Sequence, residues 1–273
     1  MRRFAKAHAC GNDFLIVEGE CNRELAVNLC ARHTGIGADG VEFLTWTGER
    51  SGKIQLVNAD GSLAEISGNG TRCVAAWMVH HIQTAQQRPM EAGATIDLET
   101  DAGPRSCRLV RDDGHQFEFA SAMGIPAIRN RRVTLKDATS VDGIEVSTGN
   151  PHFVIFVGGK EGDDFLSHDR HWEEMGRQIC FHRDFPEQTN VEFVRVLTAK
   201  RIAIRIYERG VGPTTSSGTG TCATAAATMF QRGSTGSLLV NAPGGDQRVD
   251  WDNLDSELIL TGPAELIATG EAW

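Results

Sequence analysis

ISGNGTRC at residues 66–73 and SSGTGTCA at residues 216–223 share one pattern, a serine followed by Gly-x-Gly and then by an apolar run. Serine is a favoured helix N-cap, and glycines allow the tight turn from which a helix can start. The runs that follow, residues 68–82 and 218–230, carry Ala, Met and other apolar residues on nearly every face. A helix that is apolar all round belongs in a protein core. The two stretches therefore predict two buried helices, each entered through a serine turn.

Other features upstream of the two serines also recur, in the same order. A Gly-Asn pair precedes each of two apolar runs, FLIV at residues 14–17 and FVIFV at residues 153–157. Alternating apolar residues then precede a turn in residues 53–61 and again in residues 201–210. Runs of this length and alternation are typical of β-strands. Three features recurring in one order indicate an internal duplication.

The fold class that follows is α+β, with two pseudo-symmetric domains, each a strand-rich sheet or barrel wrapped around one central buried helix. Short apolar segments broken by Gly, Pro, Asp or Asn predict the further strands. Residues 23–35 and 167–182 predict one amphipathic surface helix in each half. We expect domains over residues 1–118 and 119–262, and we expect segment 263–273 to be able to return to the first half.

The bulk composition narrows the class of ligand. The chain has 273 residues and a formal net charge of −9, with its Lys and Arg dispersed along the sequence. This balance argues against nucleic acid or an anionic membrane as the partner and favours a small molecule. No secretion signal or membrane-spanning run is visible, so we expect a cytoplasmic protein.

The seven cysteines show no CxxC pair and no metal-ligand spacing. We interpret them as reduced thiols in a chain that binds no metal. Cys73 and Cys222 lie more than one helical turn beyond the serines, so we expect both to be small core residues.

The serine turns themselves suggest a chemistry. A Gly-x-Gly turn at a helix start directs backbone N–H groups outward, and the helix dipole adds positive potential there, so a carboxylate is favoured. If the halves pack about a pseudo-two-fold axis, Ser67 and Ser217 approach one bound molecule from opposite sides. That arrangement suits moving a proton from one face of a carbon to the other. Each serine taken alone is more simply an N-cap, and it is the pairing within a duplicated frame that favours function.

Six stretches, in order, resemble the motifs of the diaminopimelate epimerase family. They are HACGNDF (8–14), RHTGIGADG (32–40), NADGSLAEISGNGTRC (58–73), GNPHFV (149–154), NVEF (190–193) and YERGVGPTTSSGTGTCA (207–223). The resemblance implies interconversion of LL- and meso-diaminopimelate on the path to lysine and peptidoglycan, without pyridoxal phosphate, another cofactor or a metal. It also implies two similar domains with the site in the cleft between them, and a homodimer.

Carried over residue by residue, the resemblance implies a catalytic set and a substrate-binding set. Ser67 and Ser217 occupy the positions of the acid/base pair, with His152 and Glu208 beside them. Arg209 can grip a carboxylate with a bidentate fork, and side-chain amides can both donate and accept hydrogen bonds. The resemblance places these residues around an amino-acid substrate: Asn12, Asn58, Gly68, Asn69, Asn150, Asn190, Glu208, Arg209, Gly218 and Thr219.

The chain departs from the family at the two central positions, where the family carries cysteines and this sequence has Ser67 and Ser217. A thiol at a helix N-terminus can ionise near neutral pH, whereas an alcohol cannot, so each serine needs a neighbouring base. Three readings stay open. In the first, the chain epimerises diaminopimelate. In the second, it is a related cofactor-independent isomerase or racemase that acts on another amino or carboxylic acid. In the third, it is a catalytically impaired ligand-binding form, one origin of which would be engineered Cys-to-Ser exchange.

Overall fold

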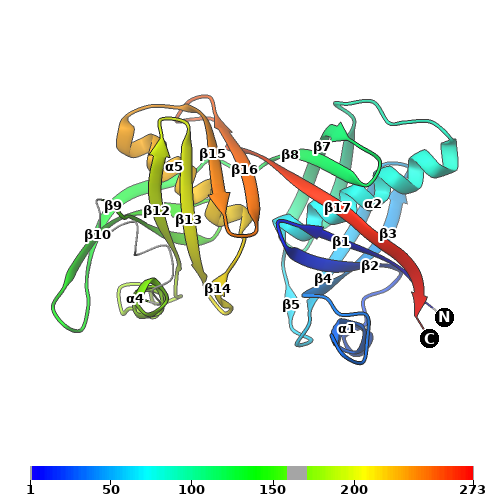
Figure 1. The fold of residues 1–273 in the computed structure, drawn as a ribbon, viewed down its shortest axis with the longest axis horizontal. Coiled ribbons are helices and arrows are strands. Elements are labelled where there is room, and N and C mark those ends of the chain that lie inside the picture. Colours follow the sequence, from blue (N-terminus) through cyan, green and yellow to red (C-terminus); the bar gives the residue numbers. More distant parts are fainter. Residues whose placement is uncertain (1, 159–170, 273) are drawn as a thin grey trace. The chain divides into compact units, whose positions relative to one another are not determined.

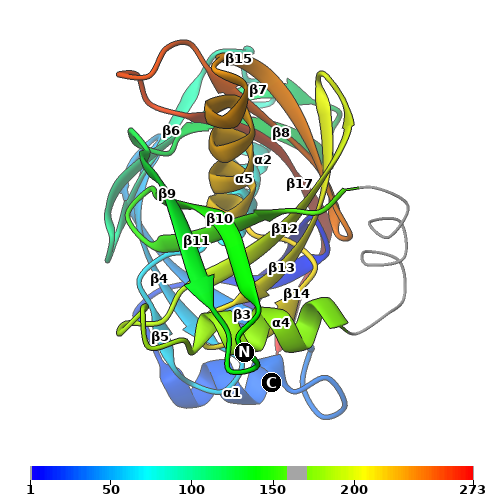
Figure 2. The same cartoon turned by 90° about the vertical axis from the view of Figure 1, so that its left-hand side faces the viewer.

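The computed structural model describes residues 2–158 and 171–272, which form two compact units. Unit 1 comprises Met1–Ser121 together with Thr261–Trp273, and unit 2 comprises Ala122–Leu260. Each unit is a curved sheet around one long helix, which Figures 1 and 2 show for α2 and α5. The predicted α+β fold with two strand-rich halves, each wrapped around a buried helix, is confirmed.

Unit 1 is a closed ring of eight strands. The ring runs β1–β2–β3–β4–β6–β7–β8–β17 and returns to β1, with parallel pairing at β2–β3 and at β4–β6. The strands are β1 (Arg2–Ala9), β2 (Asn12–Glu18), β3 (Gly40–Gly48), β4 (Ser51–Asn58), β6 (Thr95–Thr100), β7 (Gly103–Asp112), β8 (Gln116–Ala122) and β17 (Ile259–Ala272), with a short β5 (Leu63–Ala64) beside β4.

Unit 2 repeats this order. Its strands pair as β9–β10–β11–β12–β13–β15–β16, again with parallel pairing at β11–β12 and at β13–β15. They are β9 (Ala127–Thr134), β10 (Ser140–Ser147), β11 (Pro151–Phe156), β12 (Asn190–Thr198), β13 (Arg201–Glu208), β15 (Gly236–Ala242) and β16 (Gly245–Trp251), with a short β14 (Gly212–Thr214) beside β13.

The register of equivalent hairpins matches residue for residue. Val41 pairs with Val57 in unit 1, and Val191 pairs with Tyr207 in unit 2. Each hairpin also contains an irregularity just before its turn, between Trp46 and Gly48 in one and between Val196 and Thr198 in the other. Positions that differ by 150 in number are therefore structurally equivalent through these hairpins and through the serine turns.

The central helices are α2 (Gly68–Gln86) and α5 (Gly218–Arg232). Both are buried along most of their length, and their small residues, such as Ala75 and Ala226, allow the helix to lie close to the surrounding strands. Each helix ends at a residue in the left-handed conformation, Gln87 or Gly233. Burial of a Val or Met side chain on these helices contributes about 1.5–3 kcal/mol, and the helix shares the central core of its unit with the inward-facing residues of the strands.

A second layer explains why some strands are apolar on both faces. In β2, Phe14 and Ile16 pack against the α2 side, whereas Leu15 and Val17 pack with α1 (Arg23–Cys30). In β11, Val154 faces the α5 core, whereas Phe153 and Ile155 pack with α4 (His171–Cys180). Strands between two layers require uninterrupted apolar sequence, which is what FLIV and FVIF supply.

Both outer helices end earlier in the chain than the sequence predicts. The helix expected over residues 23–35 ends at Cys30, because residues 31–37 fold back so that the N–H groups of Ile36 and Gly37 donate to the carbonyl of Leu29. The helix expected over residues 167–182 spans His171–Cys180, and its first four expected residues lie outside the described part of the chain. Among the helices that the structure describes, none is long and apolar enough to cross a membrane.

Candidate active site

Both serines of the repeated pattern are helix N-caps. Ser67 Oγ accepts from the N–H of Gly70 at 3.1 Å, and Ser217 Oγ accepts from the N–H of Gly220 at 3.3 Å. Each serine has extended backbone angles, as an N-cap requires. The cap bond uses one acceptor position of the hydroxyl, so the O–H proton of each serine remains available to a second partner.

The first turn after each serine contains backbone N–H groups that precede the helical hydrogen-bond ladder. The carbonyl of Ser67 accepts from Thr71, and that of Ser217 accepts from Thr221, so the helical ladder begins there. The N–H groups of the first helical residues precede this ladder, and those of Gly70 and Gly220 donate to the serine hydroxyls. Gly68 and Asn69 in unit 1, and Gly218 and Thr219 in unit 2, therefore lie where the helix dipole favours an anion.

In unit 2, the second partner of the serine is Glu208. The Glu208 side chain at the end of β13 is hydrogen-bonded to Ser217, and burial raises its pKa above the ordinary value despite that bond. A carboxyl group with a raised pKa exchanges protons more readily near neutral pH than an ordinary surface carboxylate. Ser217 and Glu208 thus form a hydroxyl–carboxyl pair at the start of a helix.

A buried histidine network stands beside this pair. His152 Nδ1 lies 2.7 Å from Glu192 Oε1, and neither side chain is exposed to solvent. His152 Nε2 lies 3.1 Å from Asn150 Oδ1, and Asn150 Nδ2 donates to Thr219 Oγ1 at 3.2 Å. The network therefore links β11 and β12 to the first turn of α5, and it orients the Asn150 amide.

Glu192 received no role in the sequence analysis, although the NVEF motif contains it. Burial raises its pKa, while the adjacent His152 acts in the opposite direction. The available signal was a charged residue within an otherwise apolar strand segment, because buried charges occur where they are paired. The parallel β11–β12 register pairs His152 with Asn190. This register brings the side chains of His152 and Glu192 together.

Asn190 and Arg209 are joined through the backbone. Asn190 Oδ1 accepts from the N–H of Arg209 at 2.9 Å, and Asn190 Nδ2 donates to the carbonyl of Pro151 at 3.2 Å. The exposed guanidinium of Arg209 donates to the carbonyl of Glu187 at 2.9 Å. Asn190 thus holds the segment that carries Glu208 and Arg209, and the Arg209 head group keeps further donors for a ligand.

In unit 1, a chain of amides crosses the start of α2. Asn69 Nδ2 donates to Asn12 Oδ1 at 3.3 Å, and Asn12 Nδ2 donates to Asp39 Oδ2 at 2.7 Å. Arg72, only 1% exposed, donates to Asn69 Oδ1 at 2.6 Å and to the carbonyl of Pro263 at 3.2 Å. Arg72 was not expected at the site, and it orients the Asn69 side chain from within the core. Asn12–Asn69 is the counterpart of Asn150–Thr219 in unit 2.

Ion pairs anchor Asn12 from the other side. Asp13 pairs with Lys6 at 3.1 Å and with Arg32 at 2.8 Å, and Arg32 also pairs with Asp39 at 2.7 Å. Burial raises the pKa of Asp13, but hydrogen bonds from Arg32 and Lys6 outweigh it and leave this pKa below its usual range. The carboxylate of Asp39 that receives the Asn12 amide is therefore held in a fixed position.

Asn58 has a different setting from the other predicted amides. Asn58 Nδ2 donates to Ser62 Oγ at 3.0 Å, and Ser62 in turn donates to Asp60. Asn58 thus stabilises the turn to which it belongs.

The structure brings most of the predicted site residues together within each unit. Within unit 2 it brings together Ser217, Glu208, His152, Asn150 and Thr219. Within unit 1 it brings together Ser67, Asn12 and Asn69 through the first turn of α2.

Cys73 and Cys222 lie in the helix cores. Both are fully buried, and burial raises the pKa of the Cys73 thiol far above its ordinary value. A thiol in such surroundings is not a proton acceptor near neutral pH. These cysteines therefore do not substitute for the serines.

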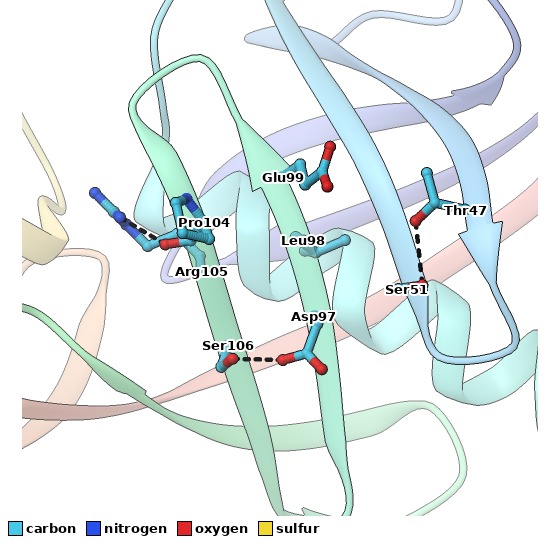
Figure 3. A pocket seen from close by; sticks show the side chains of 8 residues that line it. All are labelled: Thr47, Ser51, Asp97, Leu98, Glu99, Pro104, Arg105 and Ser106. Carbon is cyan, nitrogen blue, oxygen red and sulfur yellow. Dashed lines mark hydrogen bonds between the residues drawn. The ribbon is translucent and has the colours of Figure 1, made fainter.

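The surface hollow in Figure 3 lies apart from the serine turns. It is lined by Thr47, Ser51, Asp97, Leu98, Glu99, Pro104, Arg105 and Ser106, from the β3–β4 and β6–β7 hairpins. Its polar groups bond one another, as Ser106 does with Asp97 and Thr47 with Ser51. None of the predicted site residues lines this hollow.

Comparisons with known sequences agree on one family, and comparison with solved structures shows the fold. A family model described as diaminopimelate epimerase matches residues 4–128 and 144–267. A diaminopimelate epimerase from Rippkaea orientalis is 32% identical over 289 residues, covering 98% of this chain and 97% of the relative. One from Gloeothece citriformis is 34% identical, with coverage of 98% and 97%. Among solved structures, a probable proline racemase from Agrobacterium radiobacter superposes with a TM-score of 0.70 at 14% identity, covering 100% of this chain and 93% of that one.

Proposed function

Because this chain belongs to the diaminopimelate epimerase family, we propose that it interconverts LL- and meso-diaminopimelate by exchanging the proton on an α-carbon. The observation that carries the proposal is the hydrogen bond between Ser217, at the start of α5, and the half-buried Glu208. It supplies what an alcohol lacks, a carboxyl partner that can take and return a proton.

The proposal assigns the α-carboxylate of the substrate to the helix starts. The N–H groups of Gly68, Asn69, Gly218 and Thr219 are the donors, and the helix dipoles favour the negative charge that develops when the α-proton leaves. The amides of Asn12 and Asn150 are already oriented by Asp39 and by His152, which supports a role in holding the amino and carboxylate groups.

Proton removal uses Ser217 and Glu208. The α-C–H bond breaks, the proton passes to Ser217 Oγ, and the Ser217 O–H proton passes to the Glu208 carboxylate, so the electron pair stays on the substrate. Ser67 returns a proton to the opposite face of the carbon. His152 and Glu192 keep Asn150 in place and set the electrostatic surroundings of Glu208, whose pKa responds to both.

The far end of diaminopimelate is a second amino-acid group, so the substrate needs a second carboxylate contact. We assign this contact to Arg209, whose guanidinium is exposed while its backbone is held by Asn190. The amides of Asn58 and Asn190 complete the set.

Three further points belong to the same proposal. The reaction uses no pyridoxal phosphate and no other cofactor, since the acid/base work is assigned to side chains. A cytoplasmic location is supported by Cys30, Cys73, Cys107 and Cys180, which are buried and form no disulfide. A homodimer is supported by apolar side chains left exposed on unit 2, Val196 and Leu197 among them.

The serines themselves favour a second candidate. This candidate binds the ligand but exchanges its α-proton slowly. It fits a pair of hydroxyls placed where the family carries thiols, because an alcohol is much less acidic than a thiol.

An isomerase or racemase acting on a different amino or carboxylic acid is the third candidate. It differs by not requiring a distal amino-acid end in its substrate.

Proton NMR in deuterium oxide separates these candidates. The protein is incubated with LL- and with meso-diaminopimelate, and the α-proton signal is followed. Loss of that signal through deuterium incorporation, with appearance of the other stereoisomer, is the expected result. Tight calorimetric binding without exchange identifies the binding form, whereas neither binding nor exchange contradicts the diaminopimelate assignment.

A further inference from the structure

Glu42 is a buried carboxyl group next to Gly70 in the first turn of α2. It lies on β3, is 1% exposed, and neither of its side-chain oxygens has a hydrogen-bond partner among the described residues. A buried, unpartnered carboxyl group costs several kcal/mol if charged, so a chain that retains one at this place has a use for it or tolerates its neutral form.

The carboxyl group points at the serine turn. Glu42 Oε1 and Ser67 Cβ both lie within 3.2 Å of the point that a Cβ on Gly70 would occupy. Gly70 is the residue whose N–H donates to Ser67 Oγ in the N-cap bond. The absence of a side chain at Gly70 therefore leaves room for the Glu42 carboxyl group beside the turn that carries Ser67, and no hydrogen bond joins the two side chains in this structure.

Unit 2 contains the same arrangement at equivalent positions. Glu192 Oε1 and Ser217 Cβ both lie within 3.2 Å of the corresponding point on Gly220. Glu192, however, is paired with His152, and Ser217 is bonded to Glu208. In that unit the serine and the buried glutamate thus each have a separate partner.

Unit 1 lacks both of those partners. The strand registers place Phe14 where unit 2 has His152, and Asn58 where it has Glu208. No titratable side chain is hydrogen-bonded to Ser67 among the residues described. Glu42 is then the carboxyl group that borders the turn carrying Ser67.

We propose that Glu42 is a positioning residue that acts as the proton partner of Ser67, the role that Glu208 has for Ser217. This inference rests on the proposed function, and it adds a carboxyl partner for Ser67, beside which the resemblance names no carboxyl group in unit 1.

As Ser67 delivers its O–H proton to the α-carbanion, the C–H bond forms from the carbanion's electron pair. Ser67 Oγ then takes the proton of the Glu42 carboxyl group, which is left as a carboxylate. In the reverse direction the carboxylate accepts the Ser67 proton while Ser67 Oγ takes the α-proton. Burial raises the pKa of Glu42 to about 8, so the group is mainly protonated at neutral pH and starts as the acid.

The titratable and charged groups around Glu42 come from two neighbouring segments. Cys73 on α2 interacts electrostatically with Glu42, and the same thiol interacts with Arg72 on α2, with Cys10 in the β1–β2 turn and with Asp13 on β2. Leu56, its partner across β3–β4, is apolar. Burial alone is the cause of the raised Glu42 pKa.

Glu42→Gln tests the inference, because glutamine preserves size but cannot exchange a proton. The variant is expected to lower kcat for deuterium exchange and inversion by roughly 10²- to 10⁴-fold with KM little changed. The alkaline limb near pH 8 in the kcat/KM profile should also disappear. Leu56→Met, a conservative change of its strand partner, serves as the core control and should keep both the rate and the limb.

A measurement independent of turnover separates failure of this inference from failure of the proposed function. Infrared difference spectra between the chain and Glu42→Gln isolate the carbonyl stretch of a protonated Glu42. That band should vanish as the pH rises through about 8, and Ser67→Ala should shift the band or its titration, whereas Ser234→Ala should not.

A Glu42 band that is absent at neutral pH, or that Ser67→Ala leaves unchanged, overturns the inference. Unchanged kinetics and an unchanged alkaline limb in a folded Glu42→Gln also overturn it in an active enzyme. If the chain exchanges no α-proton of diaminopimelate, the proposed function fails, and the infrared coupling alone decides the proton partnership.

Discussion

His152 and Glu192 are paired across two adjacent parallel strands, with Nδ1 and Oε1 2.7 Å apart and both side chains fully buried. One proton shared by such a pair keeps it neutral overall, which is why it can exist inside the unit 2 core. Removing one partner leaves the other as an isolated buried polar group.

Glu192→Leu should therefore destabilise the protein by about 3–5 kcal/mol, because the imidazole of His152 loses its buried partner. Urea unfolding followed by circular dichroism measures this. Glu257→Gln, an exposed glutamate in the same unit, is the control and should lie within about 0.5 kcal/mol of the parent. Equal stabilities for the two variants would show that the pair contributes nothing.

Glu208→Gln should lower the rate of α-proton exchange by roughly 10²- to 10⁴-fold, because Ser217 loses its proton acceptor while the hydrogen bond can be kept. Deuterium incorporation by NMR gives the rate, and calorimetry checks that ligand affinity is retained. His152→Asn is expected to lower the rate as well, through the lost orientation of Asn150. Near-parental rates in both variants would contradict serine-relay catalysis.

Arg209→Met should weaken diaminopimelate binding by about 2–5 kcal/mol, because the proposed carboxylate contact loses its charged partner. Isothermal titration calorimetry measures the change. Arg183→Met is a suitable comparison, because the Arg183 side chain is 86% exposed and lies outside the proposed site. If the two variants bind equally well, Arg209 does not contact the ligand.

The Ser67→Cys, Ser217→Cys double variant should epimerise diaminopimelate faster than the present chain. Each thiol would replace a hydroxyl at an N-cap whose helix dipole favours a thiolate. Either single variant should gain much less, since inversion needs a base on one face and an acid on the other, and such groups act as a unit. Chiral chromatography of the product measures inversion. A double variant that binds the substrate without gaining rate would count against the epimerase assignment.

Glu42 should also make stability depend on pH. Its pKa in the folded chain is about 8 against an ordinary value of 4.5. A raised pKa means that the folded state binds the proton more tightly, so this contribution is fully present below about pH 4.5 and is lost as the pH rises through about 8. The loss approaches about 1.4 kcal/mol per pH unit at its steepest. Glu42→Gln should therefore show a flatter stability profile between these limits in urea unfolding, and parallel profiles would contradict a raised pKa.

The sequence determined the features that depend on neighbouring residues. Local residue order and hydrophobic periodicity predict the serine N-caps, the glycine turns, the apolar helices and the strands FLIV and FVIF, which are apolar on both faces. The repetition of that order predicted the duplicated fold. The end of α1 was missed, because residues 31–37 fold back on the helix through a glycine with positive φ, Gly37, instead of extending it.

Only the tertiary structure decided which polar groups are buried together. His152 and Glu192 lie 40 residues apart and meet through the parallel β11–β12 register. Arg72 reaches Pro263, 191 residues away, because β17 returns to close the ring of unit 1. In the sequence, Glu42 is a single charged residue within an apolar strand. Its position beside the Ser67 turn arises because the strands enclose α2. Local pattern sets which segment is helix or strand, whereas burial, and with it the pKa of a carboxyl group, depends on what the folded chain places around it.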